Sequence, residues 1–294
     1  MTMIKVADIG NYTTKDNFMN IFESKVSNIP DMLTNRKVIL NGEEFYLKGN
    51  FDTEYRKAYK ENYIKLLYSL LCMSSNEVDN EINLVVALPL SQYKNDKDYL
   101  INRILSSELK GVYRGHERNF KINDIEVYLE GLASVEDDFE GIIVDVGGRT
   151  TDASLIYFEN GKRRVTNPYS LPIGTIKLYS DFIKMINSKY CLTLEVDEVQ
   201  RILRNGLKVD GQRVDLSEEM MIFKEYLDNL VGDLNVQYSL KTNDVAFTGG
   251  GSILLKGSIL KRLPSAYILD NPVFSNAIGM YEYGKEIWEE WKYQ

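Results

Sequence analysis

The pattern of hydrophobic and polar positions in the first half of the chain predicts several strands and little helix. Continuous apolar runs at residues 3–9 and 82–89 are typical of strands in a sheet that is covered on both faces. Asn41-Gly42 lies between two segments in which apolar and polar residues alternate, which predicts a β-hairpin. Apolar residues at helical spacing predict one amphipathic helix from Glu54 to Ser74. A second helix is expected after Asp96, followed by a strand pair at residues 111–131. We therefore expect a first half that begins β-rich and contains two helices.

The second half of the chain begins with strands and continues as helices. The segment GIIVDVGGRTTDASLIYFENGKRRV predicts three strands, joined first by a glycine turn and then by an Asn160-Gly161 turn. Helical spacing follows, interrupted by the turn VDGQRVDL and by short strands at NDVAFTGGG and AYILD. Helices are expected at residues 174–188, 195–205, 217–240, 252–262 and 276–291.

Both halves open with the same succession of a strand, a glycine turn and threonines. When VADIGNYTT is aligned with VDVGGRTTD, Asp8 falls on Asp145 and Gly10 falls on Gly147. This similarity indicates a duplicated β-lobe, although a match of nine residues can also arise by chance. No segment rich in proline, glycine or serine separates the halves, so the lobes are expected to be interleaved in sequence.

Length and charge limit the classes of function. At roughly 150 residues per domain, a chain of 294 residues is long enough for two lobes. The net charge is −8 and no block of lysine and arginine is present, so direct binding to DNA is not expected and a DNA-related role would need an adaptor. The chain has neither a leader-like start nor an apolar run of roughly 18 residues, which predicts a cytoplasmic protein without a membrane partner.

Histidine and cysteine usage excludes several kinds of site. His116 is the only histidine, so a zinc site built from a histidine cluster is excluded, and its surroundings YRGHERN are typical of a turn. Cys72 and Cys191 both lie in apolar surroundings, which predicts two buried thiols in a reducing compartment. A disulfide between them is the less favoured alternative.

The glycine turn of VDVGGRTTD has the composition of a phosphate-binding loop. Gly147 and Gly148 leave consecutive backbone N–H groups accessible, and such concave turns bind phosphate oxygens. Asp145 at the strand end is suited to hold a hydrated magnesium ion beside nucleotide phosphates, and Thr150 and Thr151 offer hydroxyl contacts. The alternative is an ordinary β-turn whose aspartate caps its own backbone.

A second loop of this kind lies near the start of the chain, and a third glycine cluster lies near the end. The third cluster, FTGGGS, follows a strand and opens a helix, whose N-terminus favours anions. None of the loops has the spacing of a P-loop. The candidate residues are Asp8, Gly10, Asn11, Tyr12, Thr13 and Lys15 in the first loop, and Gly249, Gly250 and Gly251 in the third.

Five segments resemble, in the required order, the motifs of the actin, sugar kinase and heat-shock chaperone ATPase superfamily. VADIGNYTTK and IIVDVGGRTTD look like its two phosphate motifs, and FTGGGSIL looks like its adenosine motif. LEGLAS and NPVFSNAIGMYEYG resemble its two connecting motifs. Within the superfamily the chain is most similar to the ParM-like bacterial actins that segregate plasmids.

The resemblance implies a role for each charged candidate. Asp8 and Asp145 would bind magnesium, mostly through water, and Lys15 would contact the β- and γ-phosphates. Glu130 falls where the family places the residue that polarises the attacking water, so Glu130 and Asp145 are the expected catalytic residues. The alternative for Glu130 is a first-turn glutamate that is favoured by the helix dipole.

The resemblance also assigns the loops. Gly147, Gly148, Arg149 and Thr150 would lie under the phosphates, and residues 249–251 would lie near the α-phosphate and the adenosine. Arg149 departs from the family pattern, and its side chain is expected either to turn to solvent or to add a cation to the site. Tyr12 is bulkier than the family pattern leads one to expect. Contacts to the base are not identified, and charged residues in 195–208 are candidates by position alone.

The fold class implied by the resemblance is α/β with the actin-like fold. Two interleaved ribonuclease-H-like lobes would enclose a nucleotide cleft, and each would carry a smaller subdomain. Lobe I would comprise residues 1–145 and 277–294, with its small subdomain at about 20–80. Lobe II would comprise residues 146–276, with its small subdomain at about 175–240.

The function implied by the resemblance is an ATPase in which hydrolysis is coupled to polymerisation. ATP with Mg²⁺ is the expected cofactor, and GTP is the alternative nucleotide. The chain would form homopolymeric filaments and drive plasmid DNA segregation through a DNA-binding adaptor on a centromere-like DNA. The alternatives are a small-molecule kinase that acts on a sugar or an acid, and a non-polymerising actin-like adaptor.

Overall fold

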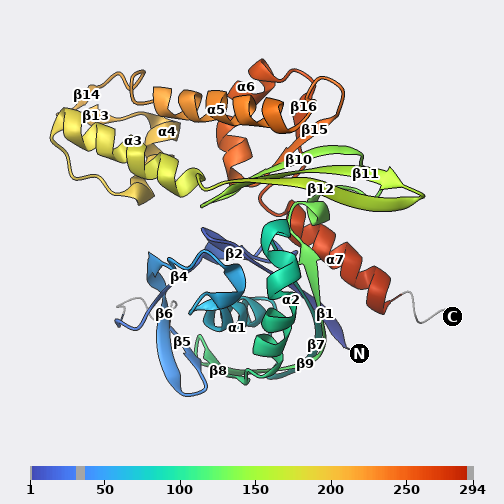
Figure 1. The fold of residues 1–294 in the computed structure, drawn as a ribbon. Coiled ribbons are helices and arrows are strands. Elements are labelled where there is room, and N and C mark those ends of the chain that lie inside the picture. The colour runs from blue at the N-terminus through green and yellow to red at the C-terminus, as the bar shows by residue number, and fades with distance from the viewer. Residues whose placement is uncertain (1, 31–36, 290–294) are drawn as a thin grey trace.

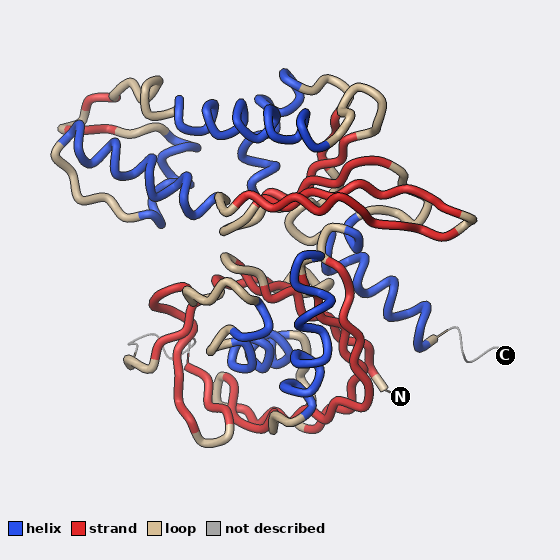
Figure 2. The backbone as a smooth tube through the Cα atoms, viewed as in Figure 1, coloured by secondary structure: helices blue, strands red, loops and turns tan. Residues whose placement is uncertain are grey.

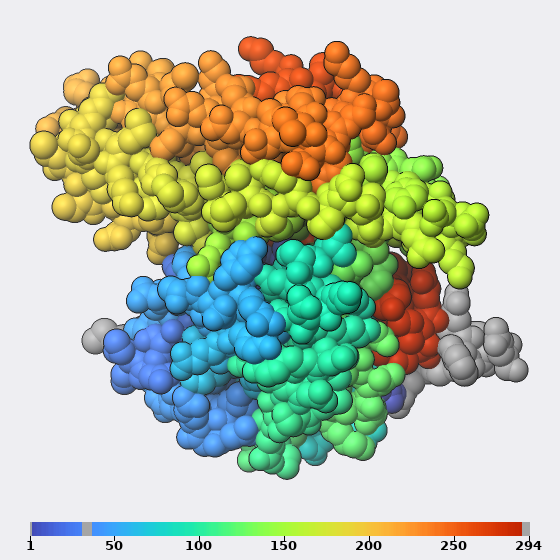
Figure 3. Space-filling view, in the orientation of Figure 1, coloured from blue at the N-terminus to red at the C-terminus, as the bar shows by residue number. Residues whose placement is uncertain are grey.

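The computed structural model describes residues 2–30 and 37–289 and shows two lobes that lie against each other (Figures 1 and 2). We call the lobe with the first strands lobe I, and the lobe formed by residues 141–268 lobe II. The chain passes to lobe II after residue 129 and returns before residue 275. In the space-filling view the lobes meet along a broad band (Figure 3).

Lobe I is built on a nine-stranded sheet with the order β3-β2-β1-β7-β9-β8-β5-β6-β4. Its central strands β1, β7 and β9 are parallel, and β1 and β7 are largely buried, which explains their continuous apolar runs in the sequence. The hairpin at Asn41-Gly42 is confirmed between β5 and β6. The strands are β1 (Met3–Ile9), β2 (Thr13–Lys15), β3 (Ile21–Glu23), β4 (Lys25–Ser27), β5 (Lys37–Leu40), β6 (Glu43–Phe51), β7 (Asp79–Leu88), β8 (Leu109–Tyr113) and β9 (His116–Leu129).

Two helices, α1 (Tyr63–Met73) and α2 (Leu90–Leu105), share one hydrophobic core with this sheet, which curves around α1 (Figure 1). The prediction that the first helix begins at Glu54 is wrong, because residues 52–62 form a loop with one 3-10 turn at Lys57–Tyr59. There the backbone N–H of Lys57 donates to the side-chain oxygen of Gln92 at 2.8 Å.

Lobe II combines a five-stranded sheet, in the order β12-β11-β10-β15-β16, with a layer of helices on one side of it (Figure 1). The predicted helices are present with shifted ends, and VDGQRVDL contains a small two-stranded hairpin. The strands are β10 (Gly141–Val146), β11 (Thr151–Glu159), β12 (Lys162–Leu171), β13 (Lys208–Val209), β14 (Gln212–Arg213), β15 (Val245–Thr248) and β16 (Ala266–Ile268). The helices are α3 (Thr175–Tyr190), α4 (Val199–Asn205), α5 (Met221–Gln237) and α6 (Gly250–Arg262).

The two sheets share a common unit of five strands. In lobe I the unit is β3-β2-β1-β7-β9, with two antiparallel pairings followed by two parallel ones. The sheet of lobe II repeats this order and these directions. The duplication that the short alignment indicated is therefore present in the strand arrangement. Because β10 already belongs to lobe II, the predicted boundary after residue 145 would cut this strand, and the second lobe begins at Gly141.

The last helix, α7 (Ser275–Trp288), packs on lobe I. Its residues Ala277 and Met280 lie in one apolar cluster with Ala133, which belongs to the 3-10 turn Leu132–Ser134. A Cβ atom on Gly279 would lie 1.5 Å from the carbonyl oxygen of Ala133. The helix therefore approaches this turn more closely than any side chain would permit.

The two thiols differ in environment. Cys72 is buried as predicted, but Cys191 is exposed, because it ends α3 in a left-handed conformation at the surface. Both are free thiols. His116 is the exposed first residue of β9, directly after the turn that joins β8 to β9. Among the described residues, no helix combines the length and the apolar character that crossing a bilayer requires.

Candidate functional site

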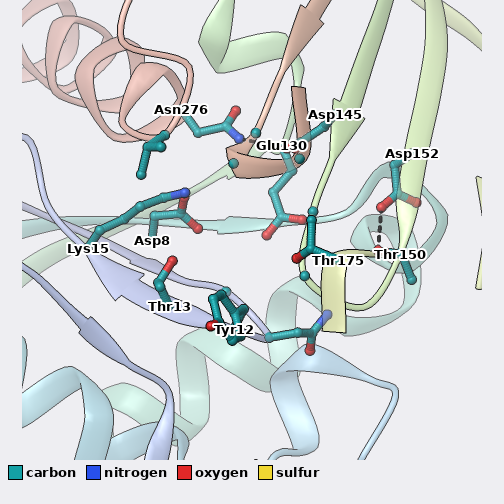
Figure 4. A pocket seen from close by; sticks show the side chains of 18 of the residues that line it. Asp8, Tyr12, Thr13, Lys15, Glu130, Asp145, Thr150, Asp152, Thr175 and Asn276 are labelled. Carbon is teal, nitrogen blue, oxygen red and sulfur yellow. Dashed lines mark hydrogen bonds and ion pairs between the residues drawn. The ribbon is translucent and has the colours of Figure 1, made fainter. Parts of the chain in front are cut away.

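A pocket of about 480 Å³ lies between the lobes, where the three glycine loops meet. In Figure 4, Asp8 and Lys15 lie on one side, Thr150 and Asp152 lie on the other, and Glu130 extends between them. The structure brings almost all of the predicted site residues to this pocket, while their roles stay predictions. The predicted residues that line it are Asp8, Gly10, Asn11, Tyr12, Thr13, Lys15, Glu130, Asp145, Gly147, Gly148, Thr150, Gly249, Gly250 and Gly251.

Asp8, at the end of β1, is buried between two cations. The ammonium of Lys15 lies 3.3 Å from its Oδ2, and the ammonium of Lys57 lies 3.4 Å from its Oδ1. Burial alone would raise the pKa of Asp8, but the charges of Lys15 and Lys57 outweigh burial and lower this pKa. Asp8 therefore carries a negative charge at neutral pH.

Lys57 is a pocket residue that the sequence analysis missed. Its side chain is only 6% exposed and forms ion pairs with both Asp8 and Glu130. Burial disfavours the charged form, but the carboxylates of Glu130 and Asp8 outweigh burial and raise the pKa of Lys57. Lys57 lies in the unremarkable segment EYRKAYK, within the stretch predicted to be helical, so no local signal could have revealed it.

Glu130 directly follows β9 and reaches into the pocket (Figure 4). Burial raises the pKa of Glu130, and repulsion from Asp8 and Asp145 adds to this effect, whereas Lys57 opposes it. The chain turns directly after Glu130 into the 3-10 turn Leu132–Ser134, and no α-helix begins there. The alternative of a glutamate in the first turn of an α-helix therefore does not apply.

Asp145, at the end of β10, is held by an amide. The Nδ2 of Asn276 donates to its Oδ2 at 3.0 Å, and the Oδ1 of Asn276 accepts from the N–H of Gly131 at 2.9 Å. Asn276 thus connects α7 both to Asp145 and to the turn after Glu130. Burial raises the pKa of Asp145 to about 6, with Asp152 and Asp8 adding repulsion and Lys15 opposing it.

The carboxylates of the pocket fit a hydrated divalent cation. In the described part of the chain, Asp145 has no ion-pair partner, so a cation beside it would offset its repulsion from Asp8 and Asp152. The described residues contain no group of three histidine, cysteine, aspartate or glutamate side chains that could hold a metal. A cation at this site would therefore depend on one or two carboxylates, with water and ligand oxygens completing its shell, as Mg²⁺ does.

The third glycine loop closes the pocket beside Asp145. Gly249 has a φ of +80°, and a Cβ atom on it would lie 2.3 Å from Oδ1 of Asp145, so only glycine fits there. Helix α6 begins directly after it, and α3 begins at Thr175, which also lines the pocket. The unpaired N–H groups of helix N-termini favour anionic ligands.

Helices of lobe II supply a further set of lining residues that the sequence analysis did not name. They combine aromatic and aliphatic surface with a few polar groups, which suits a flat heterocyclic base. Three of them fall in the stretch 195–208, whose charged residues were marked by position alone, and one of the three is charged. These residues are Tyr179 on α3, Gln200, Leu203 and Arg204 on α4, and Ile253 and Leu254 on α6.

Arg149 does not line the pocket, although the sequence analysis placed it under the phosphates. Its guanidinium reaches lobe I and donates to the carbonyl oxygens of Asp52 (3.3 Å), Thr53 (2.7 Å) and Glu54 (3.2 Å). The side chain therefore neither turns to solvent nor adds a cation to the site, the two arrangements that we expected. The reason is that residues 52–54 present three carbonyl groups within reach of the N–H donors of one planar guanidinium.

Lys60 provides a test of how burial acts on this segment. It is 2% exposed, and burial lowers its pKa to about 8. Repulsion from Lys57 and Arg149 adds to this effect, whereas attraction by Glu130 and Asp52 opposes it. We expect Lys60→Met to stabilise the protein by about 1–3 kcal/mol at pH 7. Between pH 8 and 10.5 the unfolded chain binds the proton that the folded chain has lost, so wild-type stability rises and the gain shrinks. Urea unfolding of both proteins at pH 7 and pH 10 measures this difference, and an equal gain at both values would contradict it.

Comparison with known families identifies both halves of the chain. Residues 7–132 match the model described as the N-terminal domain of actin-like proteins. Residues 143–261 match the model described as the C-terminal domain of the archaeal actin homologue MreB-like. The chain is built from two actin-like domains. No curated protein sequence is similar enough to the actin-like chain to match it.

Solved structures confirm the actin-like fold. The non-polymerisable quadruple mutant of pCBH ParM superposes with a TM-score of 0.80 at 20% identity, over 97% of this chain and 100% of that one. A 15-stranded ParM filament from Clostridium botulinum gives 0.74 at 19% identity, with 97% and 100% covered. An archaeal actin homolog in complex with ADP gives 0.76 at 18% identity, again with 97% and 100% covered.

Proposed function

We propose that this actin-like chain binds and hydrolyses a nucleoside triphosphate, with ATP the first candidate, and that it forms filaments. The observation that carries the proposal is the convergence of Asp8, Glu130, Asp145 and all three glycine loops on one pocket between the lobes. The archaeal homolog with ADP supports a nucleotide in such a cleft, and the ParM filament supports self-assembly. Both are properties of those proteins that we extend to this chain as a proposal.

The binding roles follow from the chemistry of the pocket. The glycine loops and the N-termini of α3 and α6 would receive the phosphates, and Lys15 would contact the outer ones. Asp8 and Asp145 would hold Mg²⁺, which supplies positive charge for the phosphate oxygens when it is bound. The base would rest among Tyr179 and the residues of α4 and α6 named above.

Glu130 and Lys57 would carry the hydrolytic step. Glu130 is positioned to accept a hydrogen bond from the attacking water and so to orient it. Lys57, paired with Glu130 and Asp8, would offset the negative charge that spreads over the transferred phosphoryl group. Because Lys57 is buried, water screens its charge less, and the charge acts more strongly on its neighbours.

A small-molecule kinase is the weaker alternative. A second pocket shares Glu130, Asp145 and Asp152 with the main one, and an acceptor would have to occupy it. Its volume is about 90 Å³, whereas sites for small organic molecules hold roughly 300 Å³ or more. The space is smaller than such a site and is large enough for water. This comparison favours hydrolysis.

Plasmid DNA segregation is the cellular role that we propose. The net charge of −8 gives the filament no electrostatic drive toward DNA, so a DNA-binding adaptor on a centromere-like DNA would connect the two. DNA binding by the purified protein alone at physiological salt would argue against such an adaptor.

Assembly is tested by light scattering and electron microscopy of the full chain after addition of Mg-ATP, and in parallel of Mg-GTP. We expect filaments with one of these nucleotides and release of phosphate. Transfer of phosphate to a sugar or acid without any polymer would replace the proposal by the kinase alternative. Nucleotide binding without either activity would favour the non-polymerising adaptor.

Glu130→Gln should separate hydrolysis from assembly. The amide keeps the size of the side chain but accepts a water proton poorly, so we expect phosphate release to slow about 100-fold while filaments still form. Glu136→Gln, at an exposed position of the following loop, is the matched control and should leave both unchanged. An unaltered rate for Glu130→Gln would remove Glu130 from the mechanism.

A further inference from the structure

Arg149 connects two segments that are each fixed within their own lobe. In lobe II, its loop is anchored to the start of α3, where the N–H groups of Thr175 and Ile176 donate to the carbonyl oxygens of Gly147 (3.0 Å) and Gly148 (2.8 Å). The N–H of Gly147 also donates to the carbonyl oxygen of Thr150 at 3.0 Å, so the backbone on both sides of Arg149 is held.

The acceptor segment is equally well held within lobe I. Gln92 of α2 accepts from the N–H of Lys57 and donates to the carbonyl oxygen of Tyr55 at 3.2 Å. Arg103 of the same helix donates to the carbonyl oxygens of Ala58 (2.6 Å) and Lys60 (2.8 Å). These bonds hold residues 55–60. Within the same segment, the side chains of Asp52 and Glu54 accept from the N–H groups of Glu54 (2.9 Å) and Arg56 (2.8 Å). The 52–60 segment is thus held by contacts within lobe I, and the bonds of Arg149 connect it to lobe II.

The two lobes also touch directly beside Arg149. A Cβ atom on Gly148 would lie 2.3 Å from the Cβ atom of Tyr12, so the second phosphate loop is pressed against the first. The three carbonyl groups that Arg149 binds precede Lys57 by three to five residues in sequence. Contact between the lobes is thus made where the phosphate loops face the ion pairs of Lys57 with Asp8 and Glu130.

We propose that Arg149 is a latch that keeps the lobes closed in the absence of nucleotide, so that the two phosphate loops are already opposed when the ligand arrives. The chain crosses between the lobes only after residue 129 and before residue 275, and Arg149 adds a connection remote in sequence from both crossings. Arg149 is therefore a positioning residue: it acts on the phosphate loops and touches no ligand. The consequence for binding rests on the proposed function, whereas the closure itself does not.

The latch has a predictable effect on affinity. When the binding-competent closed state is only partly populated, the apparent dissociation constant rises by the inverse of that fraction. If loss of the latch lowers the closed population to about a tenth, the dissociation constant rises about tenfold. Once the nucleotide is bound the lobes are closed again, so kcat should change by less than about twofold.

The test measures closure and affinity on the same proteins. Cys191 is exposed in lobe II, whereas Cys72 is buried and its pKa is raised to about 12 by burial, so Cys191 and a cysteine introduced as His116→Cys in lobe I accept spin labels selectively. Pulsed electron resonance then reports the distance between the lobes. Affinity is measured with Mg-ATP.

For Arg149→Ala we expect a longer and broader distance distribution in the free protein, recovery of the wild-type distance with saturating Mg-ATP, and the tenfold loss of affinity. Arg149→Lys keeps the positive charge but loses the planar guanidinium that binds three carbonyl groups, so its effects should be intermediate. Asp197→Ala is the control, because it removes another contact between the lobes, the ion pair of Asp197 with Lys25 at 3.6 Å. The side chain of Asp197 is exposed, so this ion pair should contribute little to closure. This control should match the wild type.

Each result decides between explanations. An unchanged distance with weaker binding would overturn the latch and make Arg149 a direct ligand contact. An unchanged distance with unchanged affinity would overturn it as well. If the wild type binds neither Mg-ATP nor Mg-GTP, the proposed function fails, but a longer distance in Arg149→Ala still supports the latch.

Discussion

Lys57→Met is expected to lower the hydrolysis rate by about 100-fold or more, one of the two strongest effects that we predict. The substitution keeps the volume of the side chain but removes the cation that pairs with Asp8 and Glu130. It also leaves Glu130 buried without its partner, which should lower the free energy of unfolding by about 3–5 kcal/mol at neutral pH. Phosphate release and urea unfolding measure the two effects.

A second variant separates the loss of catalysis from the loss of stability. In Lys57→Met combined with Glu130→Gln, no unpaired charge is left at the position of Glu130, so most of the lost stability should return, while hydrolysis should fall below that of Glu130→Gln alone. Lys60→Met is the matched control on the same segment, since it removes a lysine whose charged form burial disfavours. If the double variant hydrolyses no more slowly than Glu130→Gln alone, Lys57 has only a structural role.

Asp145→Asn is expected to stabilise the nucleotide-free protein and to abolish magnesium-dependent turnover. The amide oxygen can still accept from Asn276, but the cost of a buried charge beside Asp152 and Asp8 disappears. The folded pKa of about 6 lies above the ordinary value of 3.8, so the folded protein binds more protons between these values and wild-type stability falls as pH rises. The gain, about 1–3 kcal/mol, should be present above pH 6 and vanish below pH 4.

Calorimetry across this pH range, with and without Mg-ATP, measures both consequences. Asp152→Asn is the useful comparison, because burial also raises the pKa of Asp152, but we assign it no magnesium. It should share the gain in stability and keep magnesium-dependent binding. Turnover at the wild-type rate in Asp145→Asn would reject the proposed magnesium site.

The residues that the sequence revealed are those whose role is visible in their immediate neighbours. Asp8 and Asp145 each end an apolar run and precede a glycine turn, so strand, carboxylate and loop could be recognised together. The two carboxylates end strands of different sheets, so the expectation that they share one cleft came from the repeated loop and from the resemblance to the superfamily.

The residues that the sequence could not reveal act over long separations along the chain. Lys57 belongs to the pocket because its loop meets the ends of β1 and β9, 49 and 73 residues away in sequence. Arg149 was assigned to the phosphates because its neighbours are glycines and threonines, but its donors find carbonyl groups 95–97 residues away. The exposure of Cys191 likewise depends on where α3 ends and not on its apolar neighbours.

The two lobes contribute unequally to the proposed chemistry of the cleft, although both contain the repeated five-strand unit. In each copy, the first strand leads through an aspartate into a glycine turn, so the loop that we propose to bind phosphate occurs twice. The groups that would break the terminal bond, Lys57 and Glu130, both come from lobe I and lie outside the repeated strand–turn–strand element. A protein of this design could lose its chemistry through changes in one lobe alone and still recognise its ligand with both.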